Sequence, residues 1–492
     1  MTFTKQEFRP ILFFAIITFI AHFWHFPNLG LYEDDYFLIS QPMTMNLKDF
    51  ADFMSWHILN FNVTEGRPLL YLIEFSLGWI GHLIGDFQPL YLINYLVIFT
   101  DAILCYFFLK SLWNQPIFVF SGTLAFILYP ADTNHAYLTN VCIYTAIALL
   151  LSAFLTYIYN LKLLSYLLIF ASLFCYETVF PLFIIAPLLK NTWDKNIFKS
   201  LGKHTIILVL MLLTVFVARK LTGEARISNL DTLTLILTPL KQMAIGPVVS
   251  MSMFIYRPWQ TLLHLNSELI IFIIVAFIGI FFGLYQLTIN PELADQQINN
   301  NDNYPIIKKL ACLGLTLLIL SYPLFFTRSA MAINGRDSRV HTTAVIGASL
   351  LIGLIVYLLV NFTKNYRFTQ QLTQGSLAIF FALLLGFGLT VQQANELTWK
   401  YQQSFWTDII KLCPDLQPET IILVDAPLKI GEHLHSFIQW GTPLTLRQIY
   451  HFPDSWAQLE KMPVMNDKPR WFYWRKYTFY PKVYRLNANW TD

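Results

Sequence analysis

The chain has 492 residues, of which 55% are hydrophobic and only 13% are charged, and its mean hydropathy is positive at +0.50. Soluble domains carry about 25% charged residues, so this composition excludes an ordinary soluble enzyme and indicates a membrane protein. The formal net charge of +3 gives no reason to expect nucleic acid as a partner, because binding to a phosphate backbone needs a concentrated basic surface.

Apolar runs long enough to cross about 30 Å of hydrocarbon as helices recur from Ile11 to Val391. The first run follows Lys5 and Arg9 without a small-residue cleavage site, so it predicts a retained anchor with a cytoplasmic N-terminus. Nine spanning helices are predicted in all, at residues 10–27, 89–110, 116–130, 138–159, 204–221, 268–289, 306–326, 342–361 and 375–392.

A further apolar stretch at residues 163–189 is interrupted by Glu177 and Pro181. We interpret it as two short, half-depth helices that turn around Glu177. This hairpin keeps the lysine-rich loops on one side of the membrane, which the positive-inside rule makes cytoplasmic. The resulting fold is an all-α, multi-pass protein of the inner (plasma) membrane with about 11 membrane helices, two of them short.

Two regions are expected outside the membrane, on the outer face. Residues 28–88 form the first outer loop, in which the apolar but partly polar residues 69–86 predict an amphipathic helix on the membrane surface. Residues 393–492 hold no spanning run, and the strand-like segment 421–424 predicts a small C-terminal α/β domain. The transmembrane domain would then comprise residues 1–392.

Three adjacent acids, Glu33, Asp34 and Asp35, follow the first helix. Adjacent carboxylates repel one another, so such a group is costly unless a proton transfer or a cation uses it. It could deprotonate an acceptor hydroxyl, bind a divalent metal, or be only the hydrated start of a loop. Asp132 and His135 in the second outer loop add an acid and an imidazole on the same side, with loop capping as the alternative.

Arginines are also expected on the outer face, where positive charge is least common. Arg67 precedes the surface helix and suits a phosphate, although taken alone it is better explained by anchoring to bulk anionic lipid. Arg328, Arg336 and Arg339 lie in the outer turn that ends at His341. Either a bound anion or ion pairs with the outer-loop acids would account for these three arginines.

The order of these features resembles the GT-C superfamily of integral-membrane glycosyltransferases, which includes protein O-mannosyltransferases and aminoarabinose transferases. Asp34 and Asp35 match the family's catalytic acid, Arg67-Pro68-Leu69 matches its basic Pro-Pro-Leu motif, and Asp132 matches its second-loop acid. The segment from Gly335 resembles the family's late arginine segment, with Arg336-Asp337 in place of Arg-Tyr. Cys175-Tyr176-Glu177 resembles its Lys-Glu segment, with Tyr176 in place of the lysine.

The resemblance implies an enzyme that transfers a sugar from a polyprenyl-phosphate donor to a glycan, lipid or protein acceptor, with inversion. Asp35 or Asp34 would be the base, with Glu33 and Asp132 as further acids, and Arg67, Arg336, Arg339 or Arg328 would bind the donor phosphate. Glu177, His135 and His341 are other candidates. A divalent cation such as Mg²⁺ or Mn²⁺, held by Asp34, Asp35 and Asp132, is optional in this family.

Three other classes of function remain open from the sequence. A transporter or flippase of lipid-linked saccharides would also need outer arginines, but it should show two related halves with broken helices. A non-catalytic membrane protein of envelope assembly would leave the acids merely hydrated. A membrane-bound O-acyltransferase is the weakest alternative, because His135 and His341 lack a helical catalytic context.

Overall fold

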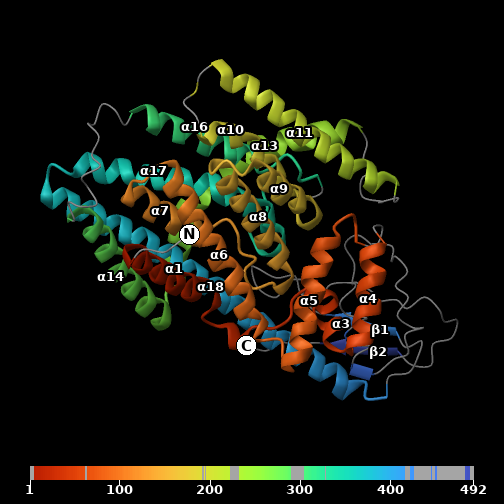
Figure 1. The fold of residues 1–492 in the computed structure, drawn as a ribbon. Helices are drawn as coiled ribbons and strands as arrows, with labels where there is room; N and C mark the ends of the chain where they lie inside the picture. Colours follow the sequence, from red (N-terminus) through yellow and green to blue (C-terminus); the bar gives the residue numbers. More distant parts are fainter. Residues whose placement is uncertain are drawn as a thin grey trace.

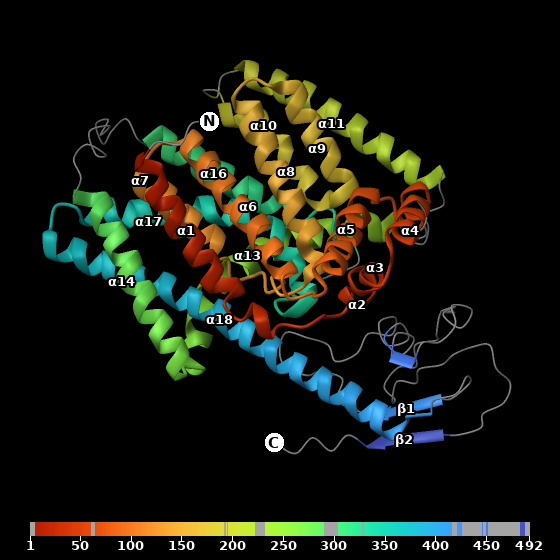
Figure 2. The same ribbon diagram turned by 60° about the horizontal axis from the view of Figure 1, so that its bottom comes forward.

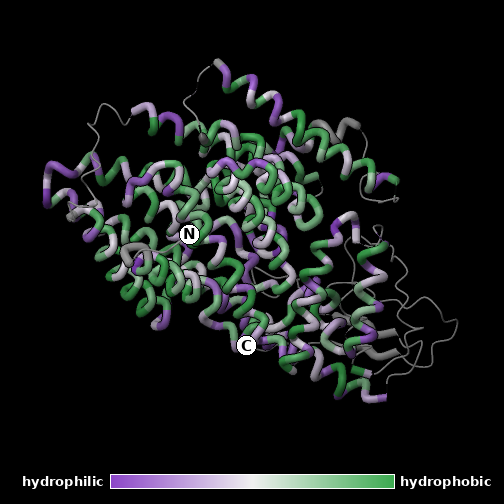
Figure 3. The backbone as a smooth tube through the Cα atoms, viewed as in Figure 1, coloured by the Kyte–Doolittle hydropathy of each residue, from purple (hydrophilic) through white to green (hydrophobic). Residues whose placement is uncertain are grey.

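The computed structural model describes residues 5–60, 64–190, 193, 195–221, 232–289, 304–326, 329–415, 421–425, 445, 449–450 and 483–487. These residues form a bundle of long helices with a group of shorter helices beside one end of it (Figure 1). Apolar residues dominate the helices of the bundle, as the hydropathy colouring shows (Figure 3).

Each of the nine predicted spans forms a helix. They are α1 (Lys5–Phe23), α6 (Leu90–Leu112), α7 (Pro116–Ile127), α8 (Val141–Ile158), α11 (Lys195–Leu221), α14 (Ser267–Ile289), α16 (Tyr304–Leu320), α17 (Val345–Thr363) and α18 (Arg367–Leu412). Within the described residues, seven helical segments are long and apolar enough to cross a membrane, whereas α7 has 12 residues and α16 has 17. The chain is therefore a multi-pass membrane protein, and the total of about 11 membrane helices remains a prediction.

The interrupted apolar stretch folds as two short helical pieces. The first is helix α9 (Lys162–Cys175), which ends at Tyr176, an extended residue, and the second consists of η3 (Glu177–Ile185) and α10 (Ala186–Lys190) joined end to end. Pro181 lies inside η3, where it lacks the N–H that a continuous helix would use. The predicted break at Glu177 is confirmed.

The first loop contains more helix than was expected. The predicted surface helix is present as α5 (Pro68–Ile84), but it is preceded by η1 (Phe26–Asn28), α2 (Asp35–Leu38), α3 (Ser40–Met43) and α4 (Leu47–Leu59). The side chain of Asn46 caps α4 by accepting a hydrogen bond from the backbone N–H of Asp49. Another unexpected helix is α13 (Thr232–Leu263), which contains three prolines.

Glycines allow close helix contacts at two crossings in the bundle. A Cβ at Gly353 of α17 would lie 2.9 Å from Cα of Gly122 in α7, and one at Gly388 of α18 would lie 2.3 Å from the carbonyl oxygen of Ala21 in α1. Small residues of this kind let membrane helices pack backbone to backbone. The two crossings hold α17 close to α7 and α18 close to α1.

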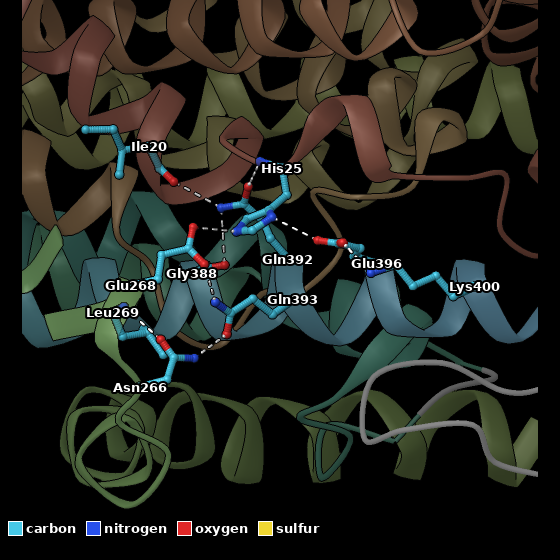
Figure 4. A network of polar contacts seen from close by, with 10 residues as sticks. All are labelled: Ile20, His25, Asn266, Glu268, Leu269, Gly388, Gln392, Gln393, Glu396 and Lys400. Atoms are coloured by element: carbon cyan, nitrogen blue, oxygen red, sulfur yellow. Dashed lines mark hydrogen bonds and ion pairs between the residues drawn. The ribbon is translucent and has the colours of Figure 1, made fainter. Parts of the chain in front are cut away.

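Polar contacts join α1 and the residue His25 that follows it to α14 and α18 (Figure 4). The ring of His25 lies between two carboxylates, with Nδ1 2.9 Å from Glu396 and Nε2 3.2 Å from Glu268. The backbone N–H of His25 also donates to Gln392, whose side-chain amide donates to the carbonyl of Ile20. These contacts hold the start of the first loop against α18.

Helix α18 continues without a break past residue 392, where the C-terminal region was expected to begin, and ends at Leu412. It leaves the bundle and leads to a pair of strands (Figure 2). These are β1 (Ile421–Asp425) and β2 (Val483–Asn487), which pair in parallel with Ile421 opposite Val483. The predicted strand at 421–424 is present as β1, while most of the expected α/β domain lies outside the described residues.

Candidate functional site

Three segments that are far apart in the sequence meet near the N-terminus of α8. They are residues 30–35 after η1, residues 132–139 after α7, and η4 (Gly335–Ala344), which leads into α17. Hydrogen bonds join residues 132–139 to residues 30–35 and to η4, and an ion pair joins η4 to residues 30–35. We give the name polar cluster to six charged side chains from these segments, namely Glu33, Asp34, Asp35, Asp132, Arg336 and Arg339.

Asp35 is a fully buried carboxyl group that fastens the first loop to the second. Its oxygens accept backbone N–H hydrogen bonds from Tyr32 (3.0 Å), Thr139 (2.9 Å) and Leu138 (3.4 Å). Burial raises the pKa of Asp35 to about 7, even though the three amides favour the charged form. A carboxyl group without exposed surface suits the organisation of two loops better than contact with a substrate.

The raised pKa of Asp35 predicts a specific dependence of stability on pH. The folded protein keeps this proton up to about pH 7, whereas the unfolded chain loses it near the ordinary value of 3.8. Stability should therefore fall as the pH rises through this window, because the folded state binds more protons. We expect the Tm of the wild type to fall relative to that of Asp35→Asn across the window, as scanning fluorimetry would measure. A pH-independent difference in Tm would contradict the prediction.

Arg336 is shared between two carboxylates of the first loop. Its guanidinium forms an ion pair with Asp34, and Nη1 lies 3.5 Å from Glu33. This pairing matches the alternative in which outer-loop acids, rather than a bound anion, neutralise the arginine. The side chain of Asp34 is 19% exposed and that of Glu33 is 4% exposed, so Asp34 is the more accessible of these two acids.

Asp132 links the second loop to η4 and α8. One of its oxygens accepts from the backbone and side-chain amides of Asn134 (2.9 and 3.0 Å), and the other accepts from the hydroxyls of Thr342 (2.8 Å) and Tyr144 (3.3 Å). Burial raises the pKa of Asp132, and these hydrogen bonds oppose the shift. In this structure the carboxylate of Asp132 therefore has a structural role, because its partners join the second loop to η4 and α8.

The three acids proposed as metal ligands do not gather around one point. Among the described residues, no group of three or more His, Cys, Asp or Glu side chains is arranged to hold a metal ion. The oxygens of Asp35 and Asp132 face amides and hydroxyls instead.

Arg67 is held in a largely buried ion-pair network at the start of α5. Its Nε donates to Oε2 of Glu177 at 2.8 Å, a second nitrogen donates to the other oxygen, and the guanidinium lies over the ring of Tyr176. Arg219 of α11 lies 3.6 Å from Glu177 and donates to the carbonyls of Gly66 and Leu173. Two predicted site residues, Arg67 and Glu177, are thus partners of each other.

Arg339 differs from the other arginines of the site. Within the described part of the chain it makes no hydrogen bond or ion pair, and its Nε is buried. It lies three residues after Arg336 in a 3₁₀ helix, so the two side chains start from the same face of η4. A partly exposed guanidinium without a counter-charge in contact is available to an anionic ligand.

Glu74 of α5 is a residue near the polar cluster that the sequence analysis did not propose for the site. It is 2% exposed, and its Oε1 accepts a hydrogen bond from the thiol of Cys142 at 3.3 Å. Burial raises the pKa of Glu74 well above its usual range, with the charges of Asp34 and Asp35 adding to this and that of Arg339 opposing it. The sequence feature that could have identified Glu74 as a site residue is its position as a single acid inside an apolar run.

The two candidate histidines have different surroundings. His341 is fully buried, and its Nδ1 lies 2.9 Å from the hydroxyl of Tyr322. The ring of His135 is stacked against that of His22. Arg328, the remaining predicted phosphate ligand, lies outside the described residues.

No family model, curated protein or solved structure matches this chain.

Proposed function

We propose that this protein is a GT-C-type glycosyltransferase that moves a sugar from a polyprenyl-phosphate donor to an acceptor hydroxyl on the outer face of the inner membrane. The observation that carries the proposal is a pair of arginines on the same face of η4. Arg336 holds the partly exposed carboxylate of Asp34, whereas the guanidinium of Arg339 contacts no acid. A phosphodiester donor needs such a cation, and an acceptor hydroxyl needs such a base.

In the proposed reaction, Asp34 takes the proton of the acceptor hydroxyl as its oxygen attacks the anomeric carbon. The bond between that carbon and the phosphate oxygen breaks, and the lipid phosphate leaves with the electron pair. Arg339 neutralises the departing phosphate. Arg336 contacts the carboxylates of both Asp34 and Glu33, so it holds Asp34 in place for the acceptor hydroxyl.

Asp35 is assigned a positioning role in this scheme rather than that of the base. Its three backbone hydrogen bonds fix the loop that presents Asp34. Asp132 acts similarly by holding the second loop against η4 through Thr342. A pre-organised loop matters because a general base must lie within hydrogen-bonding reach of the proton that it removes.

The proposal is tested by measuring donor binding and turnover with the purified protein in detergent, using a polyprenyl-phosphate sugar as the probe. We expect Arg339→Gln to weaken donor binding by about 10- to 100-fold, which corresponds to the loss of one or two charge-assisted hydrogen bonds. Native mass spectrometry and titration would measure this change. Arg367→Gln is the matched control, because Arg367 is exposed at the start of α18.

Three outcomes would change the assignment. Donor binding without turnover under any acceptor would favour a transporter or flippase of lipid-linked saccharides. Equal donor affinity in Arg339→Gln and the wild type would remove Arg339 from the site. The absence of any donor binding would contradict the glycosyltransferase proposal and favour a non-catalytic role in envelope assembly.

A further inference from the structure

A small cavity lies between α1, the segment after α7, and α18, and the proposed reaction does not use it. Its volume is about 20 Å³, and its polar lining is formed by His22, Asp132, His135, Gln392 and Asn395. Space of this size accommodates a water molecule or a single hydroxyl group, but it is too small for a sugar ring.

Two of the polar lining residues have their hydrogen bonds satisfied by the protein. The oxygens of Asp132 accept from Asn134, Tyr144 and Thr342. The side chain of Gln392 accepts from the backbone of His25 and donates to the carbonyl of Ile20. Neither side chain therefore needs a further hydrogen-bond partner in the cavity.

Asn395 is the opposite case. It is 0% exposed, and neither Nδ2 nor Oδ1 of its amide has a hydrogen-bond partner among the described residues. Its backbone carbonyl accepts a hydrogen bond from the hydroxyl of Tyr32 at 2.9 Å. A buried amide with a free donor and a free acceptor is costly unless another group satisfies it.

His135 adds a second donor and acceptor to the lining. Its ring is stacked between those of His22 and Tyr144, with centroid distances of 3.7 and 5.4 Å, and it makes no hydrogen bond to a described residue. Burial lowers the pKa of His135 to about 3, so the ring is neutral near pH 7 and carries one N–H and one bare nitrogen.

We infer that this cavity is a binding site for one neutral oxygen that carries a proton, that of water or of the hydroxyl group of a larger molecule, which the amide of Asn395 and the ring of His135 hold together. A hydroxyl can both donate and accept, as these partners require. A cation would need carboxylate oxygens, but those of Asp132 are already occupied. An anion would need a positive charge, and no lysine or arginine lines the cavity. The inference is independent of the proposed transferase activity.

The sign of a change in Tm tests the inference. Leucine is nearly isosteric with asparagine, so Asn395→Leu should lower Tm by about 2 °C if the amide is bonded to an occupant. A rise in Tm would overturn the inference, because it would mean that an unsatisfied amide had been replaced by a well-packed apolar group. Asn140→Leu is the control, since buried Asn140 donates to the carbonyl of Asn134 and its replacement should lower Tm.

A density map of the wild type at a resolution that shows ordered water provides a test that needs no variant. In a buffer without alcohols, compact density between Asn395 and His135 would identify water. Density that continues out of the cavity would identify the hydroxyl of a larger molecule. Both results support the site, and a cavity without density would contradict it.

Discussion

Asp34→Asn is expected to reduce sugar transfer by about 10²- to 10⁴-fold, the usual contribution of a general base. Asparagine has nearly the shape of aspartate but cannot take the proton of the acceptor hydroxyl. The ion pair with Arg336 would become a neutral contact, so the loop should keep its place. Turnover of a polyprenyl-phosphate sugar, measured at saturating donor, reports the effect.

Two further measurements separate catalysis from folding. Donor affinity, measured by native mass spectrometry, should change little in Asp34→Asn, because Arg339 supplies the phosphate contact in the proposal. Asp52→Asn is the matched control, since Asp52 is an exposed acid in α4 of the same loop, and it should retain full activity. Wild-type turnover in Asp34→Asn would exclude Asp34 as the base.

Replacing Arg67 by methionine is expected to destabilise the protein by about 3 to 5 kcal/mol, the cost of leaving a buried charge without its main partner. The side chains of Arg67 and Glu177 are only 17% and 15% exposed, so water cannot replace the lost ion pair. Arg219, at 3.6 Å, is the remaining cation in contact with Glu177. The decrease in thermal stability of the purified protein measures this loss.

A double-mutant cycle shows whether the loss comes from the ion pair itself. Adding Glu177→Gln to Arg67→Met should recover part of the lost stability, because the second change removes the buried charge that only Arg219 would still contact. Lys400→Met serves as the control: its ion pair with Glu396 is i,i+4 and the lysine side chain is 64% exposed, so its removal should have a small effect. Equal losses for Arg67→Met and Lys400→Met would refute the buried-network interpretation.

The long helices could be predicted from the sequence because their physical signal is local. A run of apolar residues long enough to span hydrocarbon identifies a membrane helix on its own, as for α6 and α14. The break before η3 was also local, since Glu177 and Pro181 stand inside an otherwise apolar stretch. By contrast, α13 was missed because its three prolines resemble helix breakers, although packing can support such a helix.

The composition of the candidate site was predictable, but its pairings were not. The acids after α1 and the arginines of η4 could be identified from residue type, yet nothing local shows that Arg336 contacts Asp34 while Arg339 has no such partner. Likewise, Asp34 and Asp35 are equivalent in the sequence, and only the fold buries Asp35 against the backbone amides of the second loop. Such differences depend on long-range contacts that a single sequence does not reveal.

The unbroken course of α18 has a mechanical consequence. At about 1.5 Å per residue, its 46 residues measure about 70 Å, and the part after Val391 accounts for about 30 Å of this length. Contacts of Gln392 and Glu396 with His25 hold the start of that part in place, and a continuous helix beyond them would move as one stiff unit. A tilt of about 10° at this anchor would move Leu412 by about 5 Å. Small rearrangements near His25 would thus be magnified at the far end of the helix, toward the strands.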